Sequence, residues 1–337
     1  MTTSPRRAGT LMSLEMAGQP AVLARLAGRA ATDMAAVRKL TPGGLAGVVF
    51  VARGSSDNAA LFGRYLAELS SGRPAGLASP SLYTRYRAKV DWRGYVAVAL
   101  SQSGETPEII STCSAVRDAG ATVIGITNEP GSLLAEVSDL VLSTDAGAER
   151  AVPATKTMTA QMLLVATVAA GLAGQEYGPD FARLPAAVES ILADPEAADE
   201  LAARWRDIDR LVVTGRGLAY ATALEVALKI KETTGILAEG ISAADLRHGP
   251  IATAYAGSPV LLIDAGGPAA ADTRELAEQL HDRGAQATFL QVPANLPEPA
   301  QAIAAVVRGQ QLARSLAIAR GIDPDSPAGL TKVTPTT

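Results

Sequence analysis

Two segments of the chain share one pattern, in which a short apolar run ends in Arg-Gly and a helical pattern follows. The first copy spans residues 48–69 and passes through Arg53-Gly54, and the second spans residues 211–232 and passes through Arg216-Gly217. An apolar strand that turns through glycine into a helix is the repeating step of a parallel α/β sheet. The repeat therefore predicts an internally duplicated α/β chain.

Short apolar runs separated by helical segments continue along both halves. They cover residues 95–100, 121–126, 139–143, 260–264 and 287–292. Because strands that alternate with helices form parallel sheets covered on both faces, the predicted fold class is α/β, with two doubly wound parallel-sheet domains. The expected limits are a helical lead-in at 1–40, a first domain at 41–176, a helical linker at 177–207, a second domain at 208–325 and a tail at 326–337.

The composition argues against several classes of protein. A net charge of −4 gives no basic surface for nucleic acid, and the longest apolar run, residues 162–173, is too short to cross a membrane and predicts a buried helix. Neither a Walker loop nor Gly-x-Gly-x-x-Gly follows the first strand, so we expect no nucleotide cofactor. The two histidines lack metal-binding spacing, so we expect no metal site. The single cysteine, Cys113, allows no internal disulfide, so we expect its thiol to be structural and the protein to be cytoplasmic.

The second helical pattern carries a narrow charged stripe. Glu225, Lys229 and Glu232 fall within about 60° of one another at the helical step of roughly 100° per residue, and apolar residues flank both sides. Two interpretations are open. The stripe is either an exposed row of ion pairs or the wall of a cleft that offers a base beside a cation.

The loop after the strand at 95–100 resembles an anion-binding turn. Hydroxyls stand at Ser101, Ser103 and Thr106, Gly104 permits close backbone approach, and Pro107 suits the first position of a helix. Since a helix N-terminus attracts anions, the loop can bind phosphate without a lysine or arginine. The alternative is an ordinary helix cap.

Several motifs, in order along the whole chain, resemble the sugar isomerase (SIS) domain family. They are Ser101-Gln-Ser-Gly-Glu-Thr106, residues 149–161 with Ala154-Thr-Lys-Thr, Gly215-Arg-Gly217, residues 223–232 and Leu246-Arg-His-Gly-Pro250. Residues 15–20 are similar to the family's lead-in, and residues 325–332 to its lysine-bearing tail. The greatest similarity is to the isomerase half of glutamine–fructose-6-phosphate aminotransferase and to stand-alone amino-sugar phosphate deaminases.

The resemblance implies a role for each matching residue. Glu232 is the expected base at C2 of the sugar, and His248 is expected to open the sugar ring across a homodimer interface. Glu225 and Lys229 are expected to line the site, and Lys332 is expected to close over the sugar carbonyl. The alternative for His248 is a structural histidine, and the alternative for Lys332 is a frayed tail. The residues expected to bind phosphate are Ser56, Ser101, Gln102, Ser103 and Thr106, and those expected around the substrate are Arg53, Gly54, Ser55 and Ala154.

Two departures from the aminotransferase bear on the substrate. The chain opens Met1-Thr2-Thr3 without the leading cysteine of a glutaminase domain, so we expect no use of glutamine. Arg53 and Ala154 stand where the aminotransferase has small polar or thiol side chains. The resulting hypothesis is deamination and isomerisation of glucosamine 6-phosphate; the alternatives are a lyase that eliminates the C3 group of an N-acylated hexosamine 6-phosphate and a sensor that only binds phosphosugars.

Overall fold

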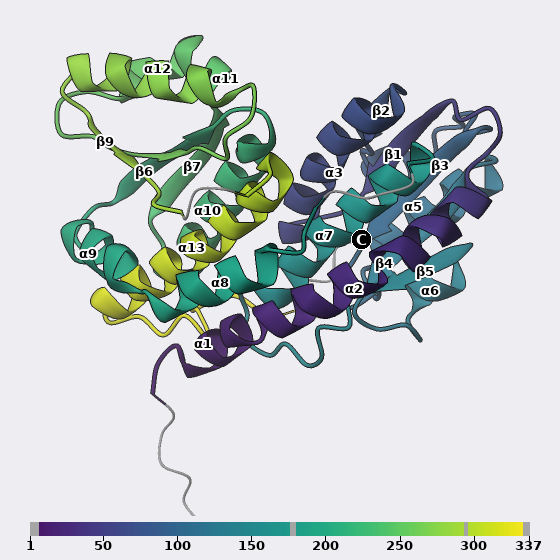
Figure 1. Cartoon of the computed structure of the whole chain (residues 1–337), viewed down its shortest axis with the longest axis horizontal. Helices are drawn as coiled ribbons and strands as arrows, with labels where there is room; N and C mark the ends of the chain where they lie inside the picture. Colours follow the sequence, from purple (N-terminus) through teal and green to yellow (C-terminus); the bar gives the residue numbers. More distant parts are fainter. Residues whose placement is uncertain (1–6, 176–179, 293–295, 333–337) are drawn as a thin grey trace, which may run out of the picture. The chain divides into compact units, whose positions relative to one another are not determined.

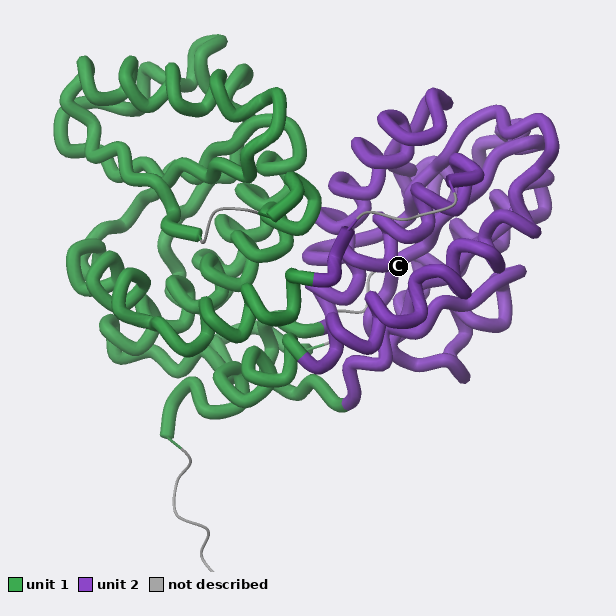
Figure 2. Tube along the Cα trace, viewed as in Figure 1, with its two compact units in different colours: residues 1–20, 148–156, 183–332 green, residues 21–147, 157–182, 333–337 purple. Residues whose placement is uncertain are grey.

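A computed structural model describes residues 7–175, 180–292 and 296–332. These residues form two compact units (Figure 2). One unit combines residues 7–20, 148–156 and 183–332, and the other combines residues 21–147 and 157–182. The segments 7–20 and 148–156 thus lie with the second sheet, although the sequence places them before it. The predicted boundary at 176–177 and residues 333–337 of the predicted tail lie outside the described residues.

The unit of residues 21–147 contains a five-stranded parallel sheet in the order β2-β1-β3-β4-β5 (Figure 1). Apolar side chains of α5 and α6 pack on one face, and α3 and α7 cover the other, where Gly63 lets α3 approach Phe50 and Val165 closely. The elements are α2 (Gln19–Leu40), β1 (Gly47–Val51), α3 (Ser55–Ser71), β2 (Ala75–Leu77), α4 (Ser81–Thr84), β3 (Tyr95–Leu100), α5 (Pro107–Asp118), β4 (Thr122–Thr127), α6 (Leu133–Glu136), β5 (Leu140–Ser143) and α7 (Lys156–Leu172).

The other unit contains a four-stranded parallel sheet in the order β7-β6-β8-β9. Helices α11 and α12 pack on one face, while α10 and α13 lie on the other, and Gly309 of α13 allows close contact with Val226 of α10. The elements are α1 (Thr10–Ala17), α8 (Leu184–Ala193), α9 (Glu196–Arg204), β6 (Arg210–Gly215), α10 (Leu218–Thr234), β7 (Leu237–Ser242), α11 (Ala243–Arg247), a 3₁₀ turn (Pro250–Thr253), β8 (Pro259–Ile263), α12 (Ala270–Asp282), β9 (Gln286–Phe289) and α13 (Glu298–Ala319).

The α/β class with parallel sheets is confirmed, and so is the buried helix at 162–173, which belongs to α7. The two sheets also share the order of their first four strands. Helices α3 and α10 each have 17 residues, and the glycines before them adopt nearly the same backbone angles: φ 59° and ψ −135° at Gly54, φ 61° and ψ −131° at Gly217. This likeness supports the duplication, which stays a prediction. No helix in the described ranges is long and apolar enough to cross a membrane.

Candidate functional site

The charged stripe of α10 is largely buried in the unit that contains the four-stranded sheet. The Glu225 side chain is 0% exposed and that of Lys229 is 1% exposed, whereas Glu232 retains 25%. An ammonium and a carboxylate removed from water in this way are rare outside functional or paired settings. The exposed-row interpretation is therefore wrong for Glu225 and Lys229, and the stripe opens to solvent only at Glu232.

Lys229 is the cation at the centre of the stripe. Its ammonium donates a hydrogen bond to Glu232 Oε2 and lies 3.7 Å from Glu225 Oε1. Burial lowers the pKa of Lys229, but the attraction of Glu225, Glu232 and Glu149 outweighs it, and the pKa stays above its usual value. The amine is therefore protonated at neutral pH and can stabilise negative charge that develops beside Glu232.

A second ion pair lies in the same unit. Lys332 donates to Glu149 Oε2 at 2.8 Å, and the Glu149 side chain is 0% exposed while that of Lys332 is 22% exposed. The other oxygen of Glu149 accepts the Thr155 N–H at 3.0 Å. Because Glu149 also acts on the pKa of Lys229, the tail lysine and the α10 stripe belong to one electrostatic group.

The lead-in helix α1 holds the segment that carries Glu149. Glu15 Oε1 accepts the Arg150 N–H, and the Glu15 carboxylate also accepts the Ala151 N–H at 3.3 Å. Burial, aided by the charge of Glu149, raises the pKa of the Glu15 carboxyl despite the hydrogen bond from Arg150. Glu15 thus fixes the backbone on one side of Glu149.

The tail is fixed to the other end of the same helix. Asp325 accepts the N–H groups of Leu11 and Met12 at 2.8 Å each, so it caps α1 from a distant part of the sequence. Its own carbonyl accepts the Val152 N–H at 3.0 Å. Helix α1 therefore joins the tail to the segment at 148–156.

The sequence did not identify Glu149, Glu15 or Asp325 as functional residues. Glu149 and Glu15 are the first residues of two segments that resemble the family, residues 149–161 and 15–20. Their position in these segments is the signal that could have identified them. Ala154 lies in the same segment as Glu149, one residue before Thr155.

His248 is exposed and lies apart from Glu232 within the chain. Helix α10 runs back from the carboxyl ends of the strands, so Glu232 near its C-terminus lies towards the opposite edge of the sheet. Strand β7 then returns to the carboxyl edge, where α11 ends at His248. The chain by itself does not bring these two residues together, and the role of His248 across an interface stays a prediction.

The predicted anion-binding loop lies at the carboxyl end of β3, in the unit of residues 21–147. Ser101 Oγ accepts the Gly104 N–H at 3.1 Å and lies 3.4 Å from Thr106 Oγ1, while Ser103 Oγ accepts the Glu105 N–H at 3.2 Å. Gly104 has φ 65°, and a side chain there would collide with Ser132. The loop is thus closely packed and brings hydroxyls to the start of α5.

Thr106 does not act as the ordinary helix cap. It is the residue before α5, but its side chain makes no capping hydrogen bond. The first N–H groups of α5 are therefore not satisfied by this hydroxyl, as an anion site requires. Gln102 lies between the two serines, and its carbonyl accepts the Asn128 N–H at 3.1 Å.

The start of α3 lies at the same edge of the sheet, because β1 and β3 are parallel neighbours. Gly54 precedes the helix, and Ser55 and Ser56 form its first turn without a side-chain cap at Gly54. Arg53 donates to Glu108 Oε2 at 3.0 Å and is 41% exposed. Burial raises the pKa of Asp57, and the Arg53 charge opposes that shift. The positive charge of Arg53 therefore partly offsets the negative charges of Glu108 and Asp57 near the hydroxyls of Ser55 and Ser56.

Two further features limit the chemistry. In the ranges that the structure describes, no group of three or more histidine, cysteine or acidic side chains could hold a metal ion. Cys113 is buried, and burial raises the pKa of its thiol to about 12, so this thiol is a structural residue rather than a nucleophile.

Comparison with known proteins agrees with the motifs. Residues 47–171 and 206–291 match the SIS domain family. The glutamine–fructose-6-phosphate aminotransferase (isomerizing) of Methanothermobacter thermautotrophicus is 34% identical over 301 residues, which cover 85% of this chain and 51% of the relative. The chain thus spans about half the length of the curated relatives it matches.

Two solved structures show the same fold over nearly the whole chain. A candidate phosphosugar isomerase from Silicibacter pomeroyi is 30% identical, with a TM-score of 0.84, and the match covers 94% of this chain and 100% of that one. The C-terminal domain of glucosamine–fructose-6-phosphate aminotransferase from Francisella tularensis is 25% identical, with a TM-score of 0.82 and coverage of 96% and 100%.

Proposed function

Because the chain belongs to the SIS domain family, we propose that it is a phosphosugar isomerase that deaminates an amino-sugar phosphate. The substrate is glucosamine 6-phosphate, and the products are fructose 6-phosphate and ammonia. The observation that carries the proposal is the buried Lys229, held between Glu225 and the partly exposed Glu232. A protein that only binds phosphosugars has no use for a buried cation paired with a carboxylate that reaches solvent, so this arrangement favours catalysis over the sensor.

The proposed reaction begins with the open-chain aldehyde. Glu232 removes the proton from C2, and the charge that develops on the C1 oxygen is stabilised by the neighbouring ammonium of Lys229. Return of the proton to C1 converts the enolamine into a C2 imine, and water then hydrolyses the imine to the ketone and ammonia. The similarity to isomerizing aminotransferases supports this route, since deamination is the reverse of placing an amino group on fructose 6-phosphate.

The phosphate is assigned to the hydroxyl-rich loop after β3 and the start of α3. Ser56, Ser101, Gln102, Ser103 and Thr106 are the proposed ligands, and the uncapped N-terminus of α5 supplies the dipole. Arg53 and Ala154 are proposed to limit what fits beside the amino group. Lys332 is proposed to approach the sugar carbonyl from its position on Glu149.

We further propose a homodimer in which His248 serves the site of the partner. His248 is exposed and lies towards the opposite sheet edge from Glu232, so a second copy is the natural source of its imidazole. Mixing the inactive variants Glu232→Gln and His248→Ala tests this arrangement. Random pairing would restore about a quarter of the wild-type rate if His248 acts across the interface, and none if it acts within its own chain.

The activity itself is tested with two substrates. Glucosamine 6-phosphate is followed by ammonia release, and N-acetylglucosamine 6-phosphate by the absorbance of an unsaturated product. Glu232→Gln is expected to abolish ammonia release while phosphosugar binding is retained, because the amide cannot take a proton. Glu278→Gln, an exposed carboxylate on α12, is the control and should keep full rate. If only the acetylated sugar gives a product, the lyase replaces the deaminase as the proposed activity. If neither sugar gives a product, the sensor is favoured.

A further inference from the structure

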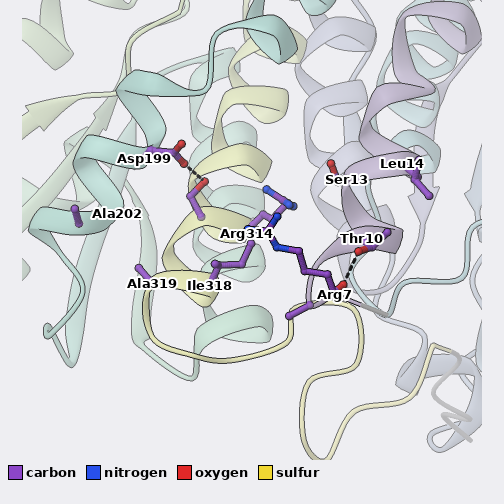
Figure 3. Close-up of a pocket in the computed structure, with 12 residues that line it drawn as sticks. Arg7, Thr10, Ser13, Leu14, Asp199, Ala202, Arg314, Ile318 and Ala319 are labelled. Carbon is purple, nitrogen blue, oxygen red and sulfur yellow. Dashed lines mark hydrogen bonds between the residues drawn. The ribbon is translucent and has the colours of Figure 1, made fainter. Parts of the chain in front are cut away.

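A cavity with a volume of about 590 Å³ lies in the unit that carries α10. Helices α1, α9 and α13 form its walls (Figure 3). It shares no lining residue with the stripe, with Glu149 or with the hydroxyl-rich loop. Its polar lining consists of Arg7, Thr10, Ser13, Asp199, Arg314 and Ser315.

Two guanidinium groups meet in this cavity. Figure 3 shows the side chains of Arg7 and Arg314 pointing toward one another, one from the segment before α1 and one from α13. Arg314 Nε donates to the Gly9 carbonyl at 3.0 Å, and within the described ranges neither arginine forms an ion pair with a carboxylate. Two like charges in one cavity repel each other, and an anion between them would remove that repulsion. The planar guanidinium matches phosphate oxygens in particular.

The arginines rather than the helix N-terminus make this site. The first N–H groups of α1 are already bound, since Gly9 donates to Asp323 at 2.9 Å and Leu11 and Met12 donate to Asp325. The carboxylate in the cavity wall is Asp199, which accepts a hydrogen bond from Ser315 Oγ at 2.5 Å. A carboxylate near two arginines repels an anion weakly, but it accepts hydrogen bonds from the hydroxyls of a sugar.

We propose that this cavity binds a phosphate monoester carried on a sugar or a nucleoside. The two arginines bind the phosphate, Asp199 accepts a hydrogen bond from a sugar hydroxyl, and Leu14 and Ile318 form the apolar wall against which the body of the ligand packs. The volume lies within the range of about 300–1,000 Å³ that is typical of small-molecule sites. The proposal does not depend on the reaction at Glu232.

Calorimetry with AMP and, separately, with glucose 6-phosphate tests the site. The hydroxyl-rich loop offers a competing phosphate site, so the titrations use the background Ser103→Ala/Thr106→Val. We expect one of the two probes to bind this background with one site per chain, and Arg7→Met to weaken that binding at least about tenfold. Arg283→Met removes an exposed arginine from the end of α12 and is the matched control, which should bind as the background does.

Arg7→Met is the decisive variant. Arg314→Met also removes the hydrogen bond to Gly9 and can loosen α1, whereas the Arg7 side chain makes no hydrogen bond or ion pair with the described residues of its unit. Binding by AMP would identify a nucleoside phosphate as the ligand class, and binding by glucose 6-phosphate a sugar phosphate. The proposal is overturned if neither probe binds saturably, or if Arg7→Met and Arg283→Met bind equally well.

Discussion

The buried cation Lys229 allows a quantitative test of the site. Replacing it by methionine keeps most of its volume but leaves the charge of Glu225 in the interior. At an effective dielectric constant of about 20, two unit charges 3.7 Å apart attract one another by about 4.5 kcal/mol. Removing one partner of a buried pair costs about 3–5 kcal/mol, so we expect Lys229→Met to lower the free energy of unfolding of its unit by that amount.

The pH of the measurement matters for this comparison. The folded-state pKa of Lys229 is raised above its ordinary value of 10.5, so its contribution to stability is complete below pH 10.5 and is lost as the pH rises through the raised pKa. Urea unfolding at pH 7 therefore measures the full contribution.

Tryptophan fluorescence can follow the relevant unit alone. The chain has two tryptophans, and Trp205 lies buried at the end of α9 whereas Trp92 lies in the other unit. Unfolding in a Trp92→Phe background thus reports on the unit that contains Lys229.

A double variant separates stability from catalysis. Glu225→Leu/Lys229→Met removes both buried charges, and a well-packed apolar pair is often as stable as a buried ion pair, so most of the lost stability should return. Turnover should not return, because the cation beside Glu232 is still missing. A loss below about 1 kcal/mol for Lys229→Met alone would refute the reasoning, since that is the range of exposed ion pairs.

Three further predictions concern other buried groups. Lys332→Met removes the cation from the buried Glu149, so it should lower the stability of its unit by about 1–3 kcal/mol and reduce kcat, whereas a frayed tail would change neither. Burial raises the folded-state pKa of Glu15 above 4.5, so the wild type should gain stability relative to Glu15→Gln as the pH falls through that raised pKa; a pH-independent difference in urea titrations would contradict it. Cys113 should react with a thiol reagent only at the rate of unfolding, and rapid labelling of native protein would show that its thiol is accessible.

The central strands were predictable because they are continuous apolar runs. The predicted strand at 95–100 matches β3 residue for residue. The edge strands β2 and β7 were not predicted: β2 has only three residues, and β7 contains Glu239 and Gly240, which interrupt any apolar pattern. An edge strand is buried less completely, so its sequence carries less of the signal.

Helix α13 was also missed, although it packs against α10. Polar side chains such as Arg308 and Gln310 are buried within it and bond to the main chain of distant segments, Arg308 to the Asp194 and Gln291 carbonyls and Gln310 to that of Thr155. These side chains mask the one-sided apolar pattern that predicts a helix.

The candidate site was predictable only where its residues are close in sequence. Glu225, Lys229 and Glu232 share a face because of helical spacing, and that spacing is visible in the sequence. Glu149 and Lys332 are 183 residues apart and meet only after the unit has folded. No local pattern indicates such a pair.

The likeness of the two halves helps explain why phosphate is expected in only one of them. Strand β8 neighbours β6 as β3 neighbours β1, so the loop after β8 corresponds to the hydroxyl-rich loop. There the chain supplies its own carboxylate. Glu298 accepts the Leu218 N–H at the start of α10, and a side chain at Gly267 would collide with the Glu298 carboxylate.

Burial, with the charge of Asp264 in addition, raises the pKa of Glu298 against the effect of that hydrogen bond. The two carboxylates of Glu298 and Asp264 already lie at this position, and their negative charge would repel a second anion. The corresponding loop in the other unit offers hydroxyls and an uncapped helix instead. We therefore expect one half of the chain to bind the phosphate and the half with a carboxylate already at its helix N-terminus to carry out the proton transfer.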